Sequence, residues 1–395
     1  MKILLFGGAF DPPHNGHISI LTEAAQYTDF DKIIVMPTGT PTHKKGCMVP
    51  FDVRHYMAKL AFEVIDSRIE VSDYEGKNLK DDYTYLTLRY LKKRYDNPQI
   101  FMLIGSDSLF TLGKWVNSEE ILANCTPVVF ARKEGLEDRI YAEIENYKKQ
   151  GADIVYIPYK VQDISSSDFR SERVGDSVLN PQVDALIDQY CLYSKNDTER
   201  YHGTAELLAK IMLDESRYIH TLNVEKLAVE LGTVYGLDTD KLRIAALLHD
   251  ILKPAPKDIL LHRAGRSGII NRIEDKPKQT LHGFAAADYA EKELGITDSD
   301  ILWAVRSHTC GRNGMTDFEK IIYLADMLCE GRSFPGRDYL LGLSKQNLDV
   351  AMKEALEHSI IWIKSKGNVI DTDSLEALEY FRRLTDCSCK EEIYE

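Results

Sequence analysis

The order of strand-like and helix-like segments constrains the fold of this chain more than any other feature. In the first half, short apolar runs alternate with stretches of helical spacing, which is the pattern of an open parallel sheet covered by helices on both faces. Beyond about residue 193, helical periodicity continues without strand-like runs. A chain of 395 residues is also long enough for more than one domain. We therefore predict an α/β domain at 1–193, a polar linker at 194–199 and an all-α domain at 200–395.

Local patterns define the expected elements of both domains. Thr239, Thr297 and Thr316 are expected helix N-caps, because each lies shortly before an apolar-periodic stretch. The expected strands are 3–6, 32–36, 100–104, 127–131 and 153–157. The expected helices are 18–27, 53–64, 84–93 and 136–150 in the first domain, and 201–213, 222–235, 241–249, 284–294, 301–307, 317–328, 348–364 and 373–384 in the second.

Composition excludes several classes of protein. The formal net charge of −13 disfavours binding to nucleic acid through its phosphate backbone, although a local basic pocket for a small phosphorylated ligand is compatible with it. No run approaches the ~18 apolar residues of a membrane span, and the apolar start is too short for a signal peptide. The seven cysteines are odd in number and scattered, so we expect reduced thiols and a cytoplasmic protein. The sequence leaves the oligomeric state open.

A glycine pair and two histidines follow the first expected strand. Gly7 and Gly8 allow a ligand to approach the backbone closely, and the helix expected next offers free N–H groups to phosphate. His14 and His17 are three residues apart, so on an opening helical turn both project from one face. Two surface histidines after a turn are the alternative, but this spacing behind a glycine pair favours a phosphate site.

A second segment, Ile164-Ser165-Ser166-Ser167-Asp168-Phe169-Arg170, is a weaker signal by itself. Serines before an apolar-periodic stretch are common helix caps, and an arginine one turn later could reach a phosphate.

Together the two segments resemble the signatures of nicotinate-nucleotide adenylyltransferases, within the HxGH nucleotidylyltransferase superfamily. Residues 7–17 resemble its GGxFDPxHxGH motif, and residues 164–170 resemble ISSTxxR with Ser167 in place of the usual threonine. The resemblance covers about residues 1–193 and implies a Rossmann-like fold. It also implies catalytic roles for His14, His17 and Arg170, and substrate contacts for Gly8, Phe10, Lys44, Tyr83, Thr84, Gly105, Asp107, Trp115, Arg132, Ser166 and Ser167.

The implied reaction transfers AMP from ATP to nicotinate mononucleotide, giving deamido-NAD and pyrophosphate. In-line displacement of this kind depends on positioning and charge stabilisation, with Mg²⁺ arriving on ATP rather than in a protein cage. A related transferase acting on pantetheine phosphate or using CTP is the alternative. The Gly7-Gly8 pair and Pro12-Pro13 favour the nicotinate branch.

In the second half, an apolar helical run ends in the adjacent pair His249-Asp250. A buried imidazole and carboxylate need a metal ion or an ion-pair partner. For a single histidine a structural role is the more common one, but six such groups on one helical domain favour a metal centre with ligands on facing helices. The candidate ligands are His220, His249, Asp250, His282, His308 and Asp326.

This order resembles the HD-domain phosphohydrolases, and the segments around 217–224, 248–253, 308–311 and 323–326 resemble the YqeK family of symmetrical bis(5′-nucleosyl)-tetraphosphatases. The resemblance implies a helical bundle with a dinuclear Fe²⁺/Fe³⁺ centre that hydrolyses diadenosine tetraphosphate to two ADP. Asp250 and Lys253 would also be catalytic. Lys253 and Arg332 are candidates for holding the polyphosphate, although a helix-end cation and a surface charge explain them nearly as well. Another nucleotide substrate, or a metal-bound nucleotide sensor that regulates the transferase, is the alternative.

Overall fold

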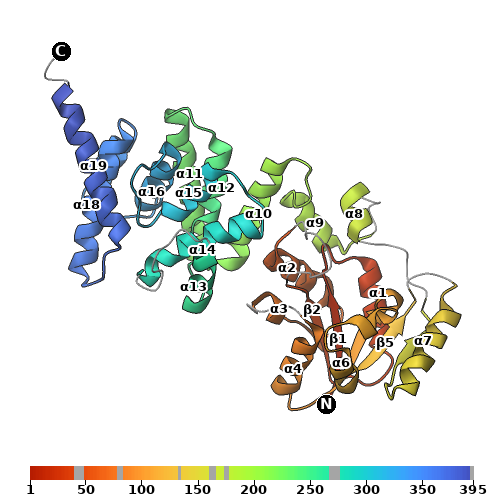
Figure 1. Ribbon diagram of the computed structural model, residues 1–395. Helices are drawn as coiled ribbons and strands as arrows, with labels where there is room; N and C mark the ends of the chain where they lie inside the picture. Colours follow the sequence, from red (N-terminus) through yellow and green to blue (C-terminus); the bar gives the residue numbers. More distant parts are fainter. Residues whose placement is uncertain are drawn as a thin grey trace. The chain divides into compact units, whose positions relative to one another are not determined.

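The structure, a computed structural model, describes residues 1–39, 49–77, 83–131, 135–159, 166–172, 178–266 and 276–391. Its internal contacts divide the chain into two compact units, Met1–Gln189 and Tyr190–Glu395. All strands of the described residues belong to the first unit, as Figure 1 shows. The predicted succession of an α/β unit and an all-α unit is confirmed.

The first unit is built on a six-stranded parallel sheet with the strand order β3-β2-β1-β4-β5-β6. All five predicted strands are present. The additional strand β3 has three residues, too few for a recognisable hydrophobic pattern. The strands are β1 (Lys2–Gly8), β2 (Lys32–Pro37), β3 (Ile69–Val71), β4 (Gln99–Gly105), β5 (Thr126–Phe130) and β6 (Val155–Ile157).

Helices connect successive strands of this sheet. The first begins at Asn15 instead of residue 18, because His14 takes the extended N-cap conformation. The helices are α1 (Asn15–Ala24), α2 (Phe51–Phe62), α3 (Tyr74–Lys77), α4 (Thr84–Arg94), α5 (Ser106–Leu109), α6 (Ser118–Asn124), α7 (Glu137–Lys149), α8 (Ser166–Glu172) and α9 (Pro181–Gln189), with a 3₁₀ turn at Leu112–Lys114.

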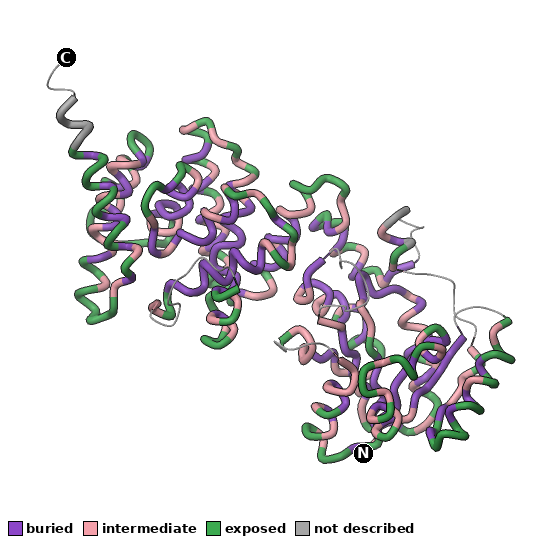
Figure 2. Tube along the Cα trace, in the orientation of Figure 1, coloured by how far each residue is buried: buried purple, intermediate pink, exposed green. Residues whose placement is uncertain are grey.

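The central strands form the core of the first unit, and Figure 2 shows them buried along most of their length. Leu4, Ile33 and Val128 are fully buried. Residues of both strand faces are buried because helices cover the sheet on both sides, which explains why the sequence shows continuous apolar runs rather than alternation.

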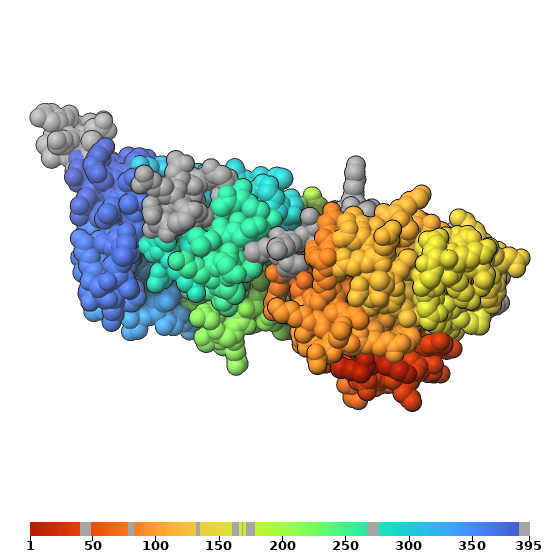
Figure 3. Space-filling view, turned by 60° about the horizontal axis from the view of Figure 1, so that its bottom comes forward, coloured from red at the N-terminus to blue at the C-terminus, as the bar shows by residue number. Residues whose placement is uncertain are grey.

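In the described residues of the second unit, all regular secondary structure is helical. Helices α13 and α17 were not predicted; α17 adjoins the glycine and proline residues of the turn before it. In Figures 1 and 3, α18 and α19 lie side by side at one end of this unit. The helices are α10 (Asp197–Met212), α11 (Glu215–Val234), α12 (Thr239–Leu248), α13 (Lys257–Arg266), α14 (Lys278–Lys292), α15 (Ser299–Ser307), α16 (Asp317–Leu328), α17 (Arg337–Ser344), α18 (Leu348–Ser365) and α19 (Thr372–Glu391).

Two of the three predicted N-caps are wrong. The carboxylates of Asp238 and Asp298, not the hydroxyls of Thr239 and Thr297, accept the free N–H groups of α12 and α15. A carboxylate accepts two such bonds and complements the positive end of the helix dipole, so it prevails over a neighbouring threonine. Thr316 is confirmed as the cap of α16. Among the described helices, none has the combination of length and apolar character that crossing a bilayer requires.

Arg54 of α2 holds together the loops at the carboxyl ends of β1 and β2. Its side chain is 1% exposed and donates to the carbonyl oxygens of Ala9 (2.8 Å), Thr38 (2.7 Å) and Gly39 (2.7 Å), and also of Val49. These bonds satisfy carbonyl groups that no strand partner reaches and fix the loop that leads to His14.

We expect Arg54→Met to destabilise the first unit by roughly 3 kcal/mol or more, because it leaves several buried carbonyl groups without donors. Scanning calorimetry of the full chain measures the change. Arg89→Met is the matched control, since Arg89 is exposed and its surface ion pair with Glu120 contributes little to stability. Equal effects of the two substitutions would contradict the role assigned to Arg54.

Candidate functional sites

The first candidate site lies where β1 ends and α1 begins. His14 is the N-cap of α1 and is 5% exposed, and its ring stacks on that of His17 with 3.6 Å between centroids. The backbone N–H of His14 donates to His17 Nδ1 at 3.2 Å. This bond leaves the proton of a neutral His17 ring on Nε2, where it can serve as a donor. The predicted pairing of the two imidazoles at the helix N-terminus is therefore present.

The second sequence signature docks on the first. Ser166 Oγ donates to the carbonyl oxygen of Pro12 at 2.9 Å, and Arg170 Nη1 donates to that of Asp11 at 2.6 Å. Arg170 Nη2 also donates to Ser167 Oγ at 3.3 Å. Segments more than 150 residues apart in sequence thus form one site. Asp11, which the sequence analysis did not single out, is 2% exposed, and its carboxylate lies 3.6 Å from Arg170 Nη1.

Gly8 of the glycine pair has a packing role that the sequence did not reveal. A Cβ atom on Gly8 would lie 2.9 Å from the Phe10 ring, so glycine is needed for the loop to close. Phe10 itself is 1% exposed and packs edge-on against Phe6, His17 and Phe62. Its position is beneath the loop, where it supports the His17 ring rather than forming a ligand surface.

The remaining predicted residues of this site lie at other strand ends and helix starts. Gly105 ends β4 and is the N-cap of α5, with Asp107 in the first turn of that helix. Tyr83 is the N-cap of α4, which begins at Thr84. Trp115 is half-buried against the core. Lys44 and Arg132 lie outside the described residues.

Sheet topology makes this edge a favourable place for a ligand. From β1 the chain proceeds to β2 on one side, whereas β4 pairs with β1 on the other. Connections that diverge at such a switch point open a crevice beyond the carboxyl ends of the strands. The histidines follow β1 and Gly105 ends β4, so both border this crevice. The α1 N-terminus, two imidazoles and the Arg170 guanidinium can together bind phosphate groups.

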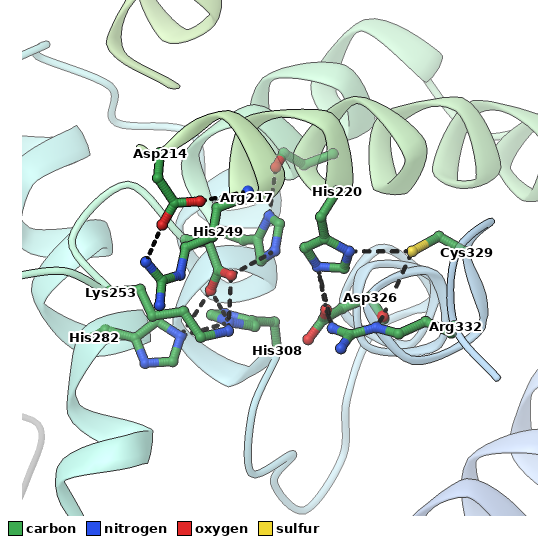
Figure 4. A network of polar contacts seen from close by, with 12 residues as sticks. Asp214, Arg217, His220, His249, Lys253, His282, His308, Asp326, Cys329 and Arg332 are labelled. Atoms are coloured by element: carbon green, nitrogen blue, oxygen red, sulfur yellow. Dashed lines mark hydrogen bonds and ion pairs between the residues drawn. The ribbon is translucent and has the colours of Figure 1, made fainter. Parts of the chain in front are cut away.

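The second candidate site is a cluster of six side chains in the second unit, drawn in Figure 4. Their ligand atoms fall into three overlapping groups of three, and within each group all the atoms lie within 4.8 Å of one another. The groups are His220, His249 and Asp250; His249, His308 and Asp326; and Asp250, His282 and His308. The sequence analysis predicted all six, and the fold brings them together from helices α11, α12, α14, α15 and α16.

Asp250 is the centre of this cluster and is 1% exposed. His282 Nε2 lies 2.9 Å from Asp250 Oδ1 and His308 Nε2 lies 3.5 Å from it, while His249 Nε2 lies 3.6 Å from Oδ2. Burial by itself raises a carboxyl pKa, but the surrounding imidazoles outweigh it and hold the pKa of Asp250 well below its usual value.

The imidazoles are oriented as metal ligands are. His249 Nδ1 bonds to the Ala246 carbonyl oxygen at 2.5 Å, and His308 Nδ1 bonds to that of Val305 at 2.7 Å. A neutral ring that donates from Nδ1 presents the lone pair of Nε2 to the cluster. Burial lowers the pKa of His249 to about 4, so its ring is neutral at pH 7. In the described part of the chain, His249 Nε2 has no hydrogen-bond partner.

The other end of the cluster is formed by His220 and Asp326. His220 Nε2 lies 2.8 Å from Asp326 Oδ1, and Cys329 Sγ contacts His220 Nδ1 at 3.4 Å. Each carboxylate also has a cation beside it. Arg332 Nη2 lies 2.7 Å from Asp326 Oδ1, and Lys253 Nζ lies 2.8 Å from Asp250 Oδ2. Sequence did not reveal Cys329, which reaches His220 only because α11 packs on α16.

The residues present fit a metal site. Several imidazole nitrogens and two carboxylates converge, and the Nε2 atoms of His282 and His308 lie only 3.1 Å apart. Such a buried set of electron-pair donors is expensive to bring together without a cation. Imidazole and carboxylate ligands suit first-row transition metals.

Comparison with known proteins agrees with this division of the chain. The cytidylyltransferase-like family matches residues 5–172, and the HD domain family matches residues 217–330. A Mycoplasma genitalium protein named "Probable nicotinate-nucleotide adenylyltransferase/Ap4A hydrolase" is 29% identical over 364 residues, which is 90% of this chain and 97% of the relative.

Relatives of single-unit length match each half separately. A probable nicotinate-nucleotide adenylyltransferase of Clostridium tetani is 34% identical over 201 residues, 49% of this chain and 98% of the relative. The symmetrical bis(5′-nucleosyl)-tetraphosphatase of Bacillus subtilis is 35% identical over 165 residues, 42% of this chain and 89% of the relative.

We expect His308→Ala to lower the affinity of the purified protein for metal at least about tenfold, because it removes a ligand nitrogen from the centre of the cluster. Metal content after dialysis against limiting metal, measured by mass spectrometry, tests this. His262→Ala is the control, since His262 is exposed on α13. Unchanged metal content in His308→Ala would show that this cluster is not the metal site.

Proposed function

This chain belongs to the nicotinate-nucleotide adenylyltransferase family over its first half and to the symmetrical bis(5′-nucleosyl)-tetraphosphatase family over its second, and we propose that it catalyses both reactions. The first converts ATP and nicotinate mononucleotide to deamido-NAD and pyrophosphate. The second converts diadenosine tetraphosphate and water to two ADP. The observation that carries the proposal is the similarity, over 90% of this chain, to a relative named for both activities.

For the transferase we propose that His14, His17, Ser167 and Arg170 hold the ATP phosphates. The phosphate of nicotinate mononucleotide attacks the α-phosphorus in line, and pyrophosphate leaves without a protein nucleophile. His17 donates from Nε2 as negative charge develops, and the bond from the His14 N–H holds its ring in place. Arg170 is fixed by its bond to Asp11, so the guanidinium is oriented before substrate binds.

The remaining roles in this unit follow the family resemblance. Gly8 and Gly105 let adenosine approach the strand ends, with Ser166 and Asp107 beside it. Tyr83, Thr84 and Trp115 face the nicotinate nucleotide, and Lys44 and Arg132 remain predicted contacts. Mg²⁺ enters with ATP. The proposed domain bounds are 1–193 and 200–395, and residues 197–199 of the connection between them are already helical.

For the hydrolase we propose that the six clustered residues hold two metal ions, with iron as the expected element. A metal pair supplies a nucleophile at neutral pH, because coordination lowers the pKa of water. Asp250 contributes the central carboxylate, whose position is fixed by Lys253 Nζ at 2.8 Å. Lys253 and Arg332 add positive charge at opposite ends of the cluster, where an extended polyphosphate binds.

A catalytic second unit is favoured over a sensor that binds nucleotide without turnover. All six predicted ligands are present in one cluster, and the matching Bacillus subtilis relative is named as a hydrolase.

A substitution in one candidate site is expected to lower the activity of that site and to leave the other activity intact. His17→Ala lowers the kcat of adenylyl transfer by about 100- to 1,000-fold, because a donor to the developing charge is lost, and leaves diadenosine tetraphosphate hydrolysis intact. Asp250→Ala does the reverse. Parallel assays of both activities on the same folded preparations measure the effect. Loss of both activities from either substitution would contradict two independent sites.

The products of hydrolysis identify the bond that is cleaved. We expect full-length protein loaded with ferrous iron to convert diadenosine tetraphosphate to two ADP, as resolved by chromatography, with Asp250→Ala as the inactive control. ATP plus AMP would indicate attack at a different phosphorus and contradict symmetrical cleavage. No reaction in metal-loaded protein would refute the proposed substrate.

A further inference from the structure

The second unit contains a cavity of about 740 Å³ that the proposed reactions do not use. It lies between α14, α15 and the start of α19, and its lining includes Lys276, Phe284, Trp303, Arg306, Arg312 and Asp371. A cavity of this size falls in the range of small-molecule binding sites.

The cavity and the metal cluster lie on opposite faces of the same two helices. With about 100° of rotation per residue, side chains two positions apart point in nearly opposite directions. Phe284 lines the cavity, whereas His282 of the same helix belongs to the cluster. Arg306 lines the cavity, whereas His308, the C-cap of α15, belongs to the cluster. The cavity is therefore separate from the candidate metal site.

Arg306 is a buried cation that forms no ion pair with any described residue. Its side chain is 4% exposed and lies over the Trp303 ring at 4.5 Å. In the described parts of the chain it has neither a hydrogen bond nor an ion pair, and its buried Nε is unsatisfied. Burial lowers the pKa of its guanidinium, although the carboxylates of Glu291, Glu319 and Asp288, all beyond ion-pair distance, oppose this shift. Such a group is costly to bury unless an anion compensates it.

The neighbouring cations are already neutralised. Arg312 also lies over Trp303, at 4.4 Å, but it forms a bidentate pair with the buried carboxylate of Glu319. Lys276 lies 2.8 Å from both Asp371 and Asp373. Among the described lining residues, Arg306 is thus the cation without an ion-pair partner, and it lies beside an aromatic ring.

We propose that this cavity binds a small organic compound that carries a flat ring and a single anionic group, a carboxylate or a phosphomonoester. The anion accepts hydrogen bonds from the Arg306 guanidinium. The ring packs against the edges of Trp303 and Phe284, because Arg306, Arg312 and Lys276 lie over the faces of these two rings. Asp371, Asp373 and Glu376 also line the cavity and repel a polyphosphate chain, so nucleoside polyphosphates are excluded.

Benzoate and phenyl phosphate are suitable probes because neither carries a nucleoside for the two proposed nucleotide sites. With metal-loaded full-length protein, we expect at least one of them to change tryptophan fluorescence saturably. The neutral analogue benzamide is expected to leave tryptophan fluorescence unchanged. Arg306→Met weakens binding at least about tenfold, and Trp303→Phe removes most of the fluorescence change. The relative affinities of the two probes distinguish a carboxylate ligand from a phosphate ligand.

Substitutions at the rim test the charge requirement without disturbing the core. Val369 lines the cavity and is 75% exposed, so Val369→Lys and Val369→Glu are expected to leave Tm unchanged. We expect the lysine substitution to tighten probe binding about threefold and the glutamate substitution to weaken it about threefold. If Arg306→Met does not fold, these two Val369 variants show by themselves whether the cavity binds an anion. Absence of binding by both probes, or affinities that are the same in wild type, Arg306→Met and the Val369 variants, would overturn the proposal.

Discussion

The arrangement of the second unit depends on one buried carboxylate, Asp250, and on the imidazoles that surround it. His249 and His308 are both C-cap residues, and each directs Nδ1 to a carbonyl oxygen three residues earlier in its own helix. The ends of two helices therefore set the direction of two ligand nitrogens, while His282 approaches from a third helix. A carboxylate in such surroundings stays charged because the imidazoles outweigh the cost of its burial. Arg306 belongs to α15, one of the helices that complete the cluster, but it lies on the face of that helix opposite to the cluster.

The first unit reaches its chemistry by a different physical route. Its candidate site depends mainly on loops and helix starts at the carboxyl edge of a parallel sheet. At this edge β1 and β4 are neighbours, but the connections that follow them lead to opposite sides of the pair. Arg54 and Arg170 both donate to loop carbonyl groups that follow β1, so two cations fix the segment between Gly8 and His14 from different sides. This explains how a protein with a net charge of −13 presents positive charge to phosphate at one place.

The cationic side chains near the two candidate sites have different kinds of bonding partner. In the first, Arg54 and Arg170 bond to backbone carbonyls near the site, and the Asp11 carboxylate lies 3.6 Å from Arg170 Nη1. In the second, Lys253 and Arg332 pair with carboxylates that we assign to the metal centre. Their charge therefore stabilises the donor set as well as a polyphosphate. Arg306 belongs to neither arrangement, which is why its cavity points to a separate anionic ligand.

Sequence by itself determined the two fold classes, the five main strands and the six members of the metal cluster, because hydrophobic period and the spacing of rare side chains are local properties. It missed β3, whose three residues are too few to show a period, and helices α13 and α17, and it misplaced two caps where an aspartate stood beside a threonine. Only the tertiary structure decided which groups meet. His220 and Asp326 are 106 residues apart, and Arg170 reaches Asp11 across 159 residues. Contacts over such separations depend on how whole helices and strands pack, and no local pattern encodes them. The same packing determines that Arg306 faces a cavity while His308, two residues away, faces the cluster.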